Sequence, residues 1–177
     1  MTMIKVEELD FPGVFEIQPR VYSDDRGLSV ELFNSKNYEF TRSSQYPLEY
    51  FSSSKYGVIR GIHYQRNWPQ GKLVTCLSGT IKDVIVDLNR SSEHYGKHIS
   101  VILSSEKLNQ IWIPAGYGHG YSVISKNGAL VNYKLSSKFL ENDQFGVIWN
   151  DKSLNIDWSV DNPIVSKRDS LFPPLST

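Results

Sequence analysis

Short stretches of β-branched and aromatic residues recur along the whole chain and constrain its fold more than any other feature. Such stretches, bounded by Gly, Pro, Asn or Asp, are typical of strands, and a helical period of 3.6 is almost absent. The expected strands are 14–17, 28–33, 72–77, 80–88, 98–103, 110–113, 120–124 and 130–135. Residues 34–42 are expected to hold one helical turn. The spacing predicts an all-β sandwich or barrel with short flanking helical turns.

The length of 177 residues fits a single domain that buries a full core. No internal repeat or linker interrupts the chain. Residues 1–34 are expected to form an N-terminal strand arm, in which 14–17 is an exposed edge strand. Residues 158–177 are expected to form a C-terminal arm that folds back over the barrel.

Charge and cysteine content exclude several classes of function. Lys plus Arg and Asp plus Glu both number 19, so no net charge attracts nucleic acid or a membrane surface. The single cysteine, Cys76, excludes an internal disulfide and fits a reducing compartment. Residues 1–8 lack an apolar signal-peptide region, and no apolar run reaches membrane-span length. The chain is therefore expected to be soluble and cytoplasmic.

An arginine and a histidine stand in an otherwise apolar stretch, residues 57–65. Regular alternation in a strand would put Arg60 and His63 on opposite faces. Gly61 lies between them, and a glycine inside a strand often marks a bulge. A bulge here would turn both side chains into one cavity. The simpler interpretation is a structural histidine at a strand end with Arg60 on the surface.

The segment 114–119, with the spacing Pro-x-Gly-x-x-His, resembles the second motif of the cupin jelly roll. In that fold a tight turn delivers a histidine, here His119, into the mouth of the barrel. Metal-binding cupins also carry a His-x-His motif, because a metal needs three or four converging ligands. His63 is followed by Tyr64 and Gln65 instead. We expect no catalytic metal.

Eight segments together resemble, in order, the dTDP-4-dehydrorhamnose 3,5-epimerase family over about residues 12–173. They are Asp25-Arg26-Gly27, Gly57 to Gln65, Gln70 to Val74, Val84 to Leu88, Ile111 to Gly120, Tyr133-Lys134, Trp149-Asn150-Asp151 and Ile156-Asp157-Trp158. The resemblance implies a cupin-like jelly roll (double-stranded β-helix) that forms a homodimer. It also implies inversion of carbons 3 and 5 of a nucleotide-linked 4-keto-6-deoxyhexose, without cofactor or metal.

The same resemblance implies roles for four catalytic residues. His63 matches the base that removes a proton beside the C4 ketone, a role that suits a neutral imidazole. Asp169 would orient that imidazole as the carboxylate of a catalytic triad does. Tyr133 matches the acid on the opposite face of the sugar. Lys72 matches the position near the C4 oxygen, where a positive charge stabilises the enolate.

Further positions match residues that contact the substrate. Arg26 and Arg60 match diphosphate binders, a role that suits the planar guanidinium. Glu31 and Arg168 match nucleotide-binding positions. His119 matches a position that contacts the substrate.

The chain departs from the family pattern around the nucleotide. Leu28-Ser29 replaces an aromatic pair, and Leu48-Glu49-Tyr50 replaces Gln-Asp-Asn. Phe139 replaces a stacking tyrosine but keeps a ring face. Gln144 replaces an acidic residue. A base is selected by donors and acceptors at fixed places, so thymidine is not assured. Glu49 is the candidate for a new base-reading residue, because a carboxylate accepts hydrogen bonds from guanine or cytosine.

Several alternatives stay open from the sequence. The enzyme could invert only C3 or only C5, isomerise a ketone, or act on a GDP- or CDP-linked sugar, including a heptose. A further alternative is a sugar-binding cupin without catalytic activity. That class gives no reason to combine His, Asp, Lys and Tyr in one chain.

Overall fold

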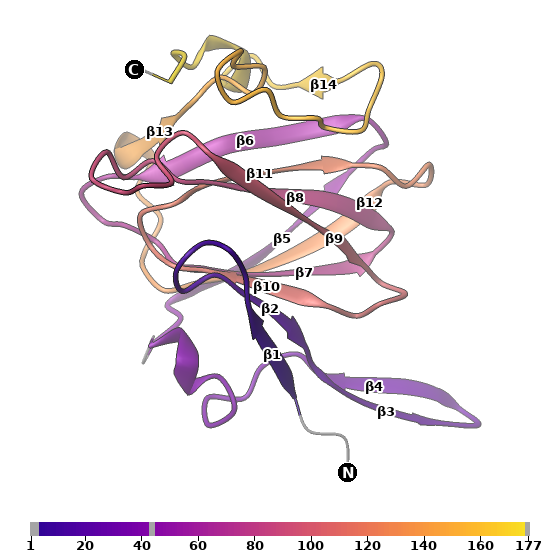
Figure 1. The fold of residues 1–177 in the computed structure, drawn as a ribbon. Helices are drawn as coiled ribbons and strands as arrows, with labels where there is room; N and C mark the ends of the chain where they lie inside the picture. The colour runs from indigo at the N-terminus through magenta and orange to yellow at the C-terminus, as the bar shows by residue number, and fades with distance from the viewer. Residues whose placement is uncertain (1–3, 43–44, 176–177) are drawn as a thin grey trace.

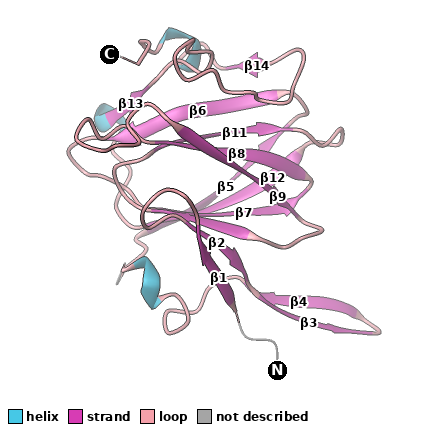
Figure 2. Ribbon diagram, viewed as in Figure 1, coloured by secondary structure: helices cyan, strands magenta, loops and turns pink. Residues whose placement is uncertain are grey.

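Two facing β-sheets make up most of the computed structural model, which describes residues 4–42 and 45–175 (Figures 1 and 2). The first sheet has the strand order β1-β2-β10-β7-β12-β5. Its strands are β1 (Lys5–Glu8), β2 (Phe15–Gln18), β10 (Gln110–Ile113), β7 (Lys72–Ser78), β12 (Ala129–Leu135) and β5 (Leu48–Ser54). Neighbouring strands in it are antiparallel, with β5 as one exposed edge.

The second sheet has the order β13-β6-β11-β8-β9. Its strands are β13 (Gln144–Gly146), β6 (Val58–Gln65), β11 (Gly118–Val123), β8 (Thr80–Val86) and β9 (His98–Ser104). The C-terminal segment adds β14 (Ile164–Val165), which pairs parallel with β6. The only helical elements described are the 3-10 turns η1 (Glu39–Thr41), η2 (Glu141–Asp143) and η3 (Asp169–Leu171). The fold is an all-β, cupin-like jelly roll with short helical turns.

A separate hairpin, β3 (Arg20–Asp24) and β4 (Gly27–Glu31), projects from the body of the molecule (Figure 1). Its side chains are mostly exposed, including the large apolar residues Tyr22 and Leu28. Nothing in the described part of the chain packs over its tip.

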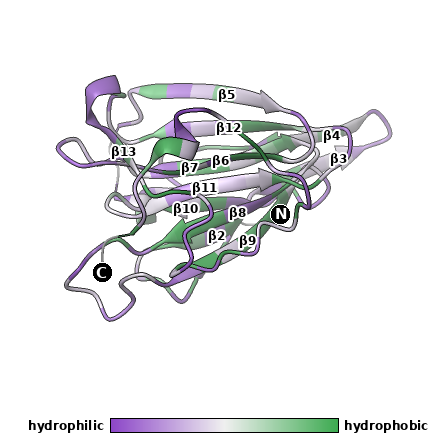
Figure 3. Ribbon diagram, turned by 90° about the horizontal axis from the view of Figure 1, so that it is seen from above, coloured by the Kyte–Doolittle hydropathy of each residue, from purple (hydrophilic) through white to green (hydrophobic). Residues whose placement is uncertain are grey.

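The hydrophobic core lies between the sheets and is extended on both outer faces. Inner residues such as Val74, Ile85 and Ile111 are fully buried. On the outer face of the first sheet, Trp112 packs in a cluster with residues from the segment between β4 and β5. On the outer face of the second sheet, Trp158 packs in a cluster with residues of β6 and β8. Most strongly hydrophobic segments of the ribbon accordingly belong to strands (Figure 3).

A bulge in β6 turns Arg60 and His63 to the same side. His63 pairs with His119, and Arg60 pairs with Tyr121 on β11. His119 and Tyr121 are two residues apart, so they share a face, and their partners must share it too. Three residues of β6 therefore span two of β11, and the predicted bulge at Gly61 is confirmed.

Most expected strands are confirmed, with two kinds of error. Residues 14–17 are not an exposed edge: β2 lies between β1 and β10, and Val14 and Ile17 are fully buried. Strands β1, β3, β5, β13 and β14 were not predicted. In β5 the sequence Leu-Glu-Tyr-Phe-Ser-Ser-Ser alternates poorly and ends in serines, which favour turns more than strands.

Two further expectations concern the ends of the chain and membranes. The helical turn predicted in 34–42 is η1, and the C-terminal segment does fold back onto β6. No helix in the described part of the chain is long and apolar enough to cross a membrane.

Substitution of Gly61 by Ala should destabilise the fold strongly. The residue has φ of +124°, and an added Cβ would lie 2.5 Å from the Gly120 Cα and 2.8 Å from the His119 carbonyl oxygen. These atoms belong to the backbone of the paired strand β11, which would have to shift, so we expect a loss of more than about 3 kcal/mol in unfolding free energy by chemical denaturation.

Gly116→Ala is the matched control. Gly116 has a φ of +104° but nothing within 4 Å of an added Cβ. Gly116→Ala should therefore show only the cost of a positive φ, a loss of about 1–2 kcal/mol in unfolding free energy. Equal losses in the two variants would contradict the role assigned to the Gly61 contact.

Candidate active site

One cavity opens between the two sheets and collects most of the predicted site residues. Strands β5, β7 and β12 of the first sheet face β6 and β11 of the second across it. Its lining residues are Tyr50, Ser52, Arg60, His63, Gln70, Lys72, His119, Tyr121, Tyr133, Leu135, Phe139, Gln144 and Arg168. The cavity holds about 220 Å³.

His63 is held from behind by Asp169. The His63 Nε2 lies 2.8 Å from Asp169 Oδ1, and the other carboxylate oxygen accepts the Gly61 N–H at 3.1 Å. The Asp169 side chain is buried, whereas His63 is 31% exposed toward the cavity. Burial acts to raise the pKa of Asp169, but hydrogen bonds from His63 and Gly61 outweigh it and leave this pKa below its usual range.

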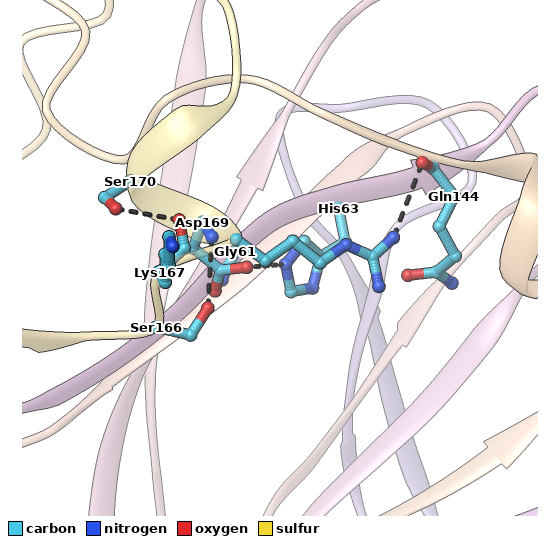
Figure 4. A network of polar contacts seen from close by, with 8 residues as sticks. Gly61, His63, Gln144, Ser166, Lys167, Asp169 and Ser170 are labelled. Atoms are coloured by element: carbon cyan, nitrogen blue, oxygen red, sulfur yellow. Dashed lines mark hydrogen bonds and ion pairs between the residues drawn. The ribbon is translucent and has the colours of Figure 1, made fainter.

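The turn η3 places Asp169 at this point. The Ser166 hydroxyl oxygen accepts the Asp169 N–H at 3.0 Å (Figure 4). The Ser170 N–H donates to the Ser166 carbonyl. The C-terminal segment is thereby fastened to β6 at the bulge. The predicted pairing of His63 with Asp169 is present.

Lys72, Asp83 and His119 form a buried charged group on the inner side of the cavity. His119 Nε2 lies 2.8 Å from Asp83 Oδ2, and both side chains are almost completely buried. Burial lowers the pKa of the Lys72 ammonium to about 8, while the negative charge of Asp83 opposes this change. Burial raises the pKa of Asp83, and His119 and Lys72 oppose that shift. The group keeps a cation in an apolar interior because a carboxylate accompanies it.

Tyr133 enters the cavity from β12, on the sheet that faces His63. Its side chain is 6% exposed. Burial, and then the neighbouring Tyr121 and Tyr50, raise its pKa well above the usual value for a phenol. Tyr133 therefore keeps its proton at neutral pH and is equipped as an acid rather than a base.

Arg60, Arg168, Phe139 and Gln144 line the more exposed part of the cavity. Arg60 Nε donates to Ser54 Oγ at 3.0 Å, and Arg168 Nη2 donates to the Gln144 carbonyl at 3.5 Å (Figure 4). Phe139 is 47% exposed, so its ring face is free to stack. Two cationic forks beside an exposed ring suit a nucleoside diphosphate.

Arg26 and Glu31 do not reach this cavity within one chain. Arg26 lies at the tip of the β3–β4 hairpin, where its side chain is 90% exposed and pairs with Asp24 at 2.5 Å. Glu31 accepts hydrogen bonds from Asn34 and Asn37. The hairpin points away from the sheets (Figure 1), and neither residue lines the cavity of its own chain.

Glu49 also lies away from the cavity. Tyr50 and Ser52 line the cavity, so alternation in β5 places Glu49 on the outer face. There it accepts from Lys134 Nζ at 2.8 Å and Asn132 Nδ2 at 3.2 Å. Within this chain, Tyr50 rather than Glu49 is the residue of this segment that faces a ligand.

Sequence reasoning missed Asp83, Tyr50 and Tyr121. Asp83 stands in the apolar run of β8 between Ile81 and Ile85, which are both fully buried. A carboxylate in the inward phase of a buried strand was a detectable signal. Tyr50 and Tyr121 gave no such signal, since aromatic residues are common in strands. Among the described residues, no group of three or more His, Cys, Asp or Glu could hold a metal ion.

Comparison with known proteins matches this geometry to one family. The family model described as dTDP-4-dehydrorhamnose 3,5-epimerase matches residues 8–177. The chain belongs to the dTDP-4-dehydrorhamnose 3,5-epimerase family. A Shigella flexneri family member of that name is 41% identical over 172 residues, which cover 96% of this chain and 93% of the relative.

Two solved structures of epimerases show how far the likeness extends. A dTDP-6-deoxy-D-glucose-3,5-epimerase from Legionella pneumophila, in complex with dTDP-4-keto-L-rhamnose, superposes with a TM-score of 0.93 at 34% identity, covering 97% of this chain and 93% of that one. A 3'-monoepimerase from Streptomyces bikiniensis, in complex with dTDP-quinovose, gives 0.86 at 28% identity, covering 94% and 86%.

Asp83→Asn should lower the pKa of Lys72 below about 8, because it removes the negative charge that opposes desolvation of the ammonium. Titration of ¹³C-labelled lysine side chains by NMR measures this, with Lys72→Met identifying the resonance. Asp157→Asn is the control, since Asp157 pairs with Lys82 at an exposed position. An unchanged Lys72 pKa in Asp83→Asn would show that the carboxylate does not sustain the charge.

Proposed function

We propose that this protein is a nucleotide-sugar epimerase that inverts C3 and C5 of a dTDP-4-keto-6-deoxyhexose. The reaction proceeds by removal of a proton beside the C4 ketone and its return from the other face. The observation that carries this proposal is the placement of two proton-transfer groups on facing sheets. His63, held by Asp169, lines the cavity from β6, and Tyr133 lines it from β12.

His63 is the base. A carboxylate accepts hydrogen bonds, so the nitrogen facing Asp169 carries the proton and Nδ1 keeps its lone pair. Nδ1 takes the proton from C3 or C5. The electrons of the broken C–H bond form a double bond to C4, and the carbonyl electron pair moves onto the C4 oxygen. The imidazolium that results is stabilised by Asp169.

Lys72 stabilises the enolate oxygen. Its ammonium is buried, and a fixed charge in a water-poor cavity acts more strongly than the same charge in water. The Asp83–His119 pair lies beside it and keeps the local charge balanced. Both groups are in place before the substrate enters, so little reorganisation opposes the reaction.

Tyr133 returns a proton to the opposite face of the carbon. The neutral phenol donates to the enolate carbon, and the carbonyl re-forms with inverted configuration. Solvent then carries a proton from the His63 imidazolium to the tyrosinate, which restores both groups. The same sequence at the second carbon completes the reaction with no net change in atoms or electrons.

Different residues recognise the diphosphate and the base of the substrate. We propose that Arg60 and Arg168 bind the phosphates and that Phe139 stacks on the base, next to Gln144. A single inversion at C3 is the second candidate, because a 3'-monoepimerase shares the fold. GDP- and CDP-linked sugars stay as alternatives to the dTDP-sugar. A cytoplasmic location stays a prediction.

We further propose a homodimer in which the hairpin serves the neighbouring cavity. Arg26, expected at the diphosphate, sits on a projecting hairpin with Tyr22 and Leu28 exposed. The edge strand β5, beside the cavity, is uncovered and exposes Phe51 by 65%. An uncovered edge and a projecting apolar hairpin are surfaces that a symmetric partner covers.

Deuterium incorporation tests the chemistry. In deuterated water the wild-type protein should place deuterium at C3 and C5 of dTDP-4-keto-6-deoxyglucose, as read by NMR. His63→Ala should abolish incorporation while nucleotide affinity stays within about fivefold, because the base acts in the transition state. Tyr133→Phe should still incorporate deuterium through His63 but form little inverted product.

Each outcome has a distinct meaning. No deuterium from the wild-type protein would refute the epimerase function, and deuterium at C3 alone would favour the single inversion. Undiminished deuterium incorporation by His63→Ala would show that His63 is not the base. A normal yield from Tyr133→Phe would mean that water supplies the second proton.

Mixed dimers test the role of Arg26. His63→Ala and Arg26→Ala should each be weakly active as homodimers. If Arg26 serves the neighbouring cavity, each mixed dimer contains one complete site, so randomly assorted subunits should recover about a quarter of the wild-type activity. Co-expression with two affinity tags isolates the mixed species.

A different result from the mixed dimers would contradict the role of Arg26 in the neighbouring cavity. If Arg26 serves the cavity of its own chain, no mixed dimer has a complete site and activity does not recover. Light scattering on the wild-type protein should give twice the mass of the chain, and a monomer at micromolar concentration would contradict the assembly.

A further inference from the structure

We propose that Tyr50 is a positioning residue that holds Tyr133 in the orientation from which it donates its proton. This inference rests on the proposed function of Tyr133. Tyr50 lines the cavity, but its proposed effect on the reaction passes through Tyr133, so its removal should affect the return of the proton more than its abstraction.

Tyr50 lies directly opposite Tyr133 in the pairing of β5 with β12. The two rings are stacked, with centroids 4.8 Å apart and an angle of 14° between their planes. Tyr133 is 6% exposed and Tyr50 is 44% exposed, so Tyr50 is the outer member of the pair. Its ring separates one face of Tyr133 from solvent at the uncovered edge of the sheet.

The other neighbours of Tyr133 contact it at an angle and do not cover that face. The Tyr121 ring is tilted at 6.4 Å, and the His119 ring meets it edge-on at 6.2 Å. Tyr121 is itself fixed by β5, because its hydroxyl lies 2.8 Å from Ser52 Oγ and 3.3 Å from Ser54 Oγ. The cavity-facing side of β5 thus supports Tyr133 directly through Tyr50 and indirectly through Tyr121.

The orientation of Tyr133 matters because its proton must reach a carbon on the face opposite His63. Catalytic groups lose effectiveness when displaced by about 1 Å. A stacked ring restricts tilting and flipping of Tyr133, and it keeps water from approaching the phenol from the β5 side. Tyr50 also contributes to the raised pKa of Tyr133, which keeps the phenol protonated.

The partition between exchange and inversion tests this role. We expect Tyr50→Ala to keep deuterium incorporation through His63 within about threefold of wild type and to lower the yield of inverted product about tenfold. Tyr50→Phe keeps the ring and should restore the wild-type yield. Tyr56→Ala is the matched control, because Tyr56 is also 44% exposed but does not line the cavity.

A double-variant cycle excludes a simple substrate contact. If Tyr50 acts through Tyr133, adding Tyr50→Ala to Tyr133→Phe should change the yield by less than about twofold. Equal loss of incorporation and product in Tyr50→Ala, or a full additional loss in the double variant, would overturn the proposal.

A measurement without substrate separates this inference from the proposed function. In protein with ¹³C-labelled tyrosine, the resonance lost in Tyr133→Phe identifies Tyr133. Tyr50→Ala should speed the flipping of this ring and lower its pKa, and Tyr56→Ala should change neither. Unchanged flipping and pKa would overturn the role of Tyr50 even if the wild-type protein proves to be an epimerase. Failure of deuterium incorporation in the wild-type protein would refute the epimerase alone.

Discussion

The site depends on the close approach of two glycines at the centre of the second sheet. Gly61 on β6 lies so near Gly120 on β11 that an added Cβ would come within 2.5 Å of the Gly120 Cα. This approach accommodates the extra residue of β6 and turns Arg60 and His63 to one side. The Gly61 N–H then donates to Asp169, so the same feature fixes the carboxylate that holds His63. One irregularity in a strand pair therefore positions His63, the carboxylate that holds it, and Arg60.

Burial of charge is the second organising constraint. Lys72 and Asp83 occupy an interior where an isolated charge is unfavourable. Asp83 supports the charge of Lys72, and His119 and Lys72 support the charge of Asp83. Asp169, in η3 beside β6, is also a buried carboxylate, and hydrogen bonds outweigh its desolvation. The cavity thereby keeps a cation at Lys72 and a neutral phenol at Tyr133, on the sheet that faces His63. These states follow from the packing of the sheets rather than from the side chains alone.

The inner and outer faces of the edge strand β5 have different roles. Its inner side chains support the tyrosines of the cavity, whereas Glu49 on its outer side pairs with Lys134. Its uncovered edge and the projecting hairpin with Arg26 leave a single chain with an open side at the cavity. The arginines inside the cavity, Arg60 and Arg168, are those that one chain supplies. In the proposed homodimer the second copy adds Arg26 to these two arginines. Completion of the cavity is thus a physical reason for two chains of this jelly roll to assemble.

The sequence by itself determined the class of fold and most strands, and it offered a bulge at Gly61 as one of two interpretations, because turn residues, apolar alternation and rare polar residues act locally. It also indicated His63, Lys72, Tyr133 and Asp169 through the order of the family motifs. It did not determine the side of β5 on which Glu49 lies, since that depends on the register with β12. Nor did it reveal Asp83 beside Lys72 or the stacking of Tyr50 on Tyr133. Lys72 and Asp83 come from opposite sheets, and Tyr50 and Tyr133 come from strands distant in the chain. Only the tertiary structure brought these residues together, through strand pairing and the burial that pairing imposes.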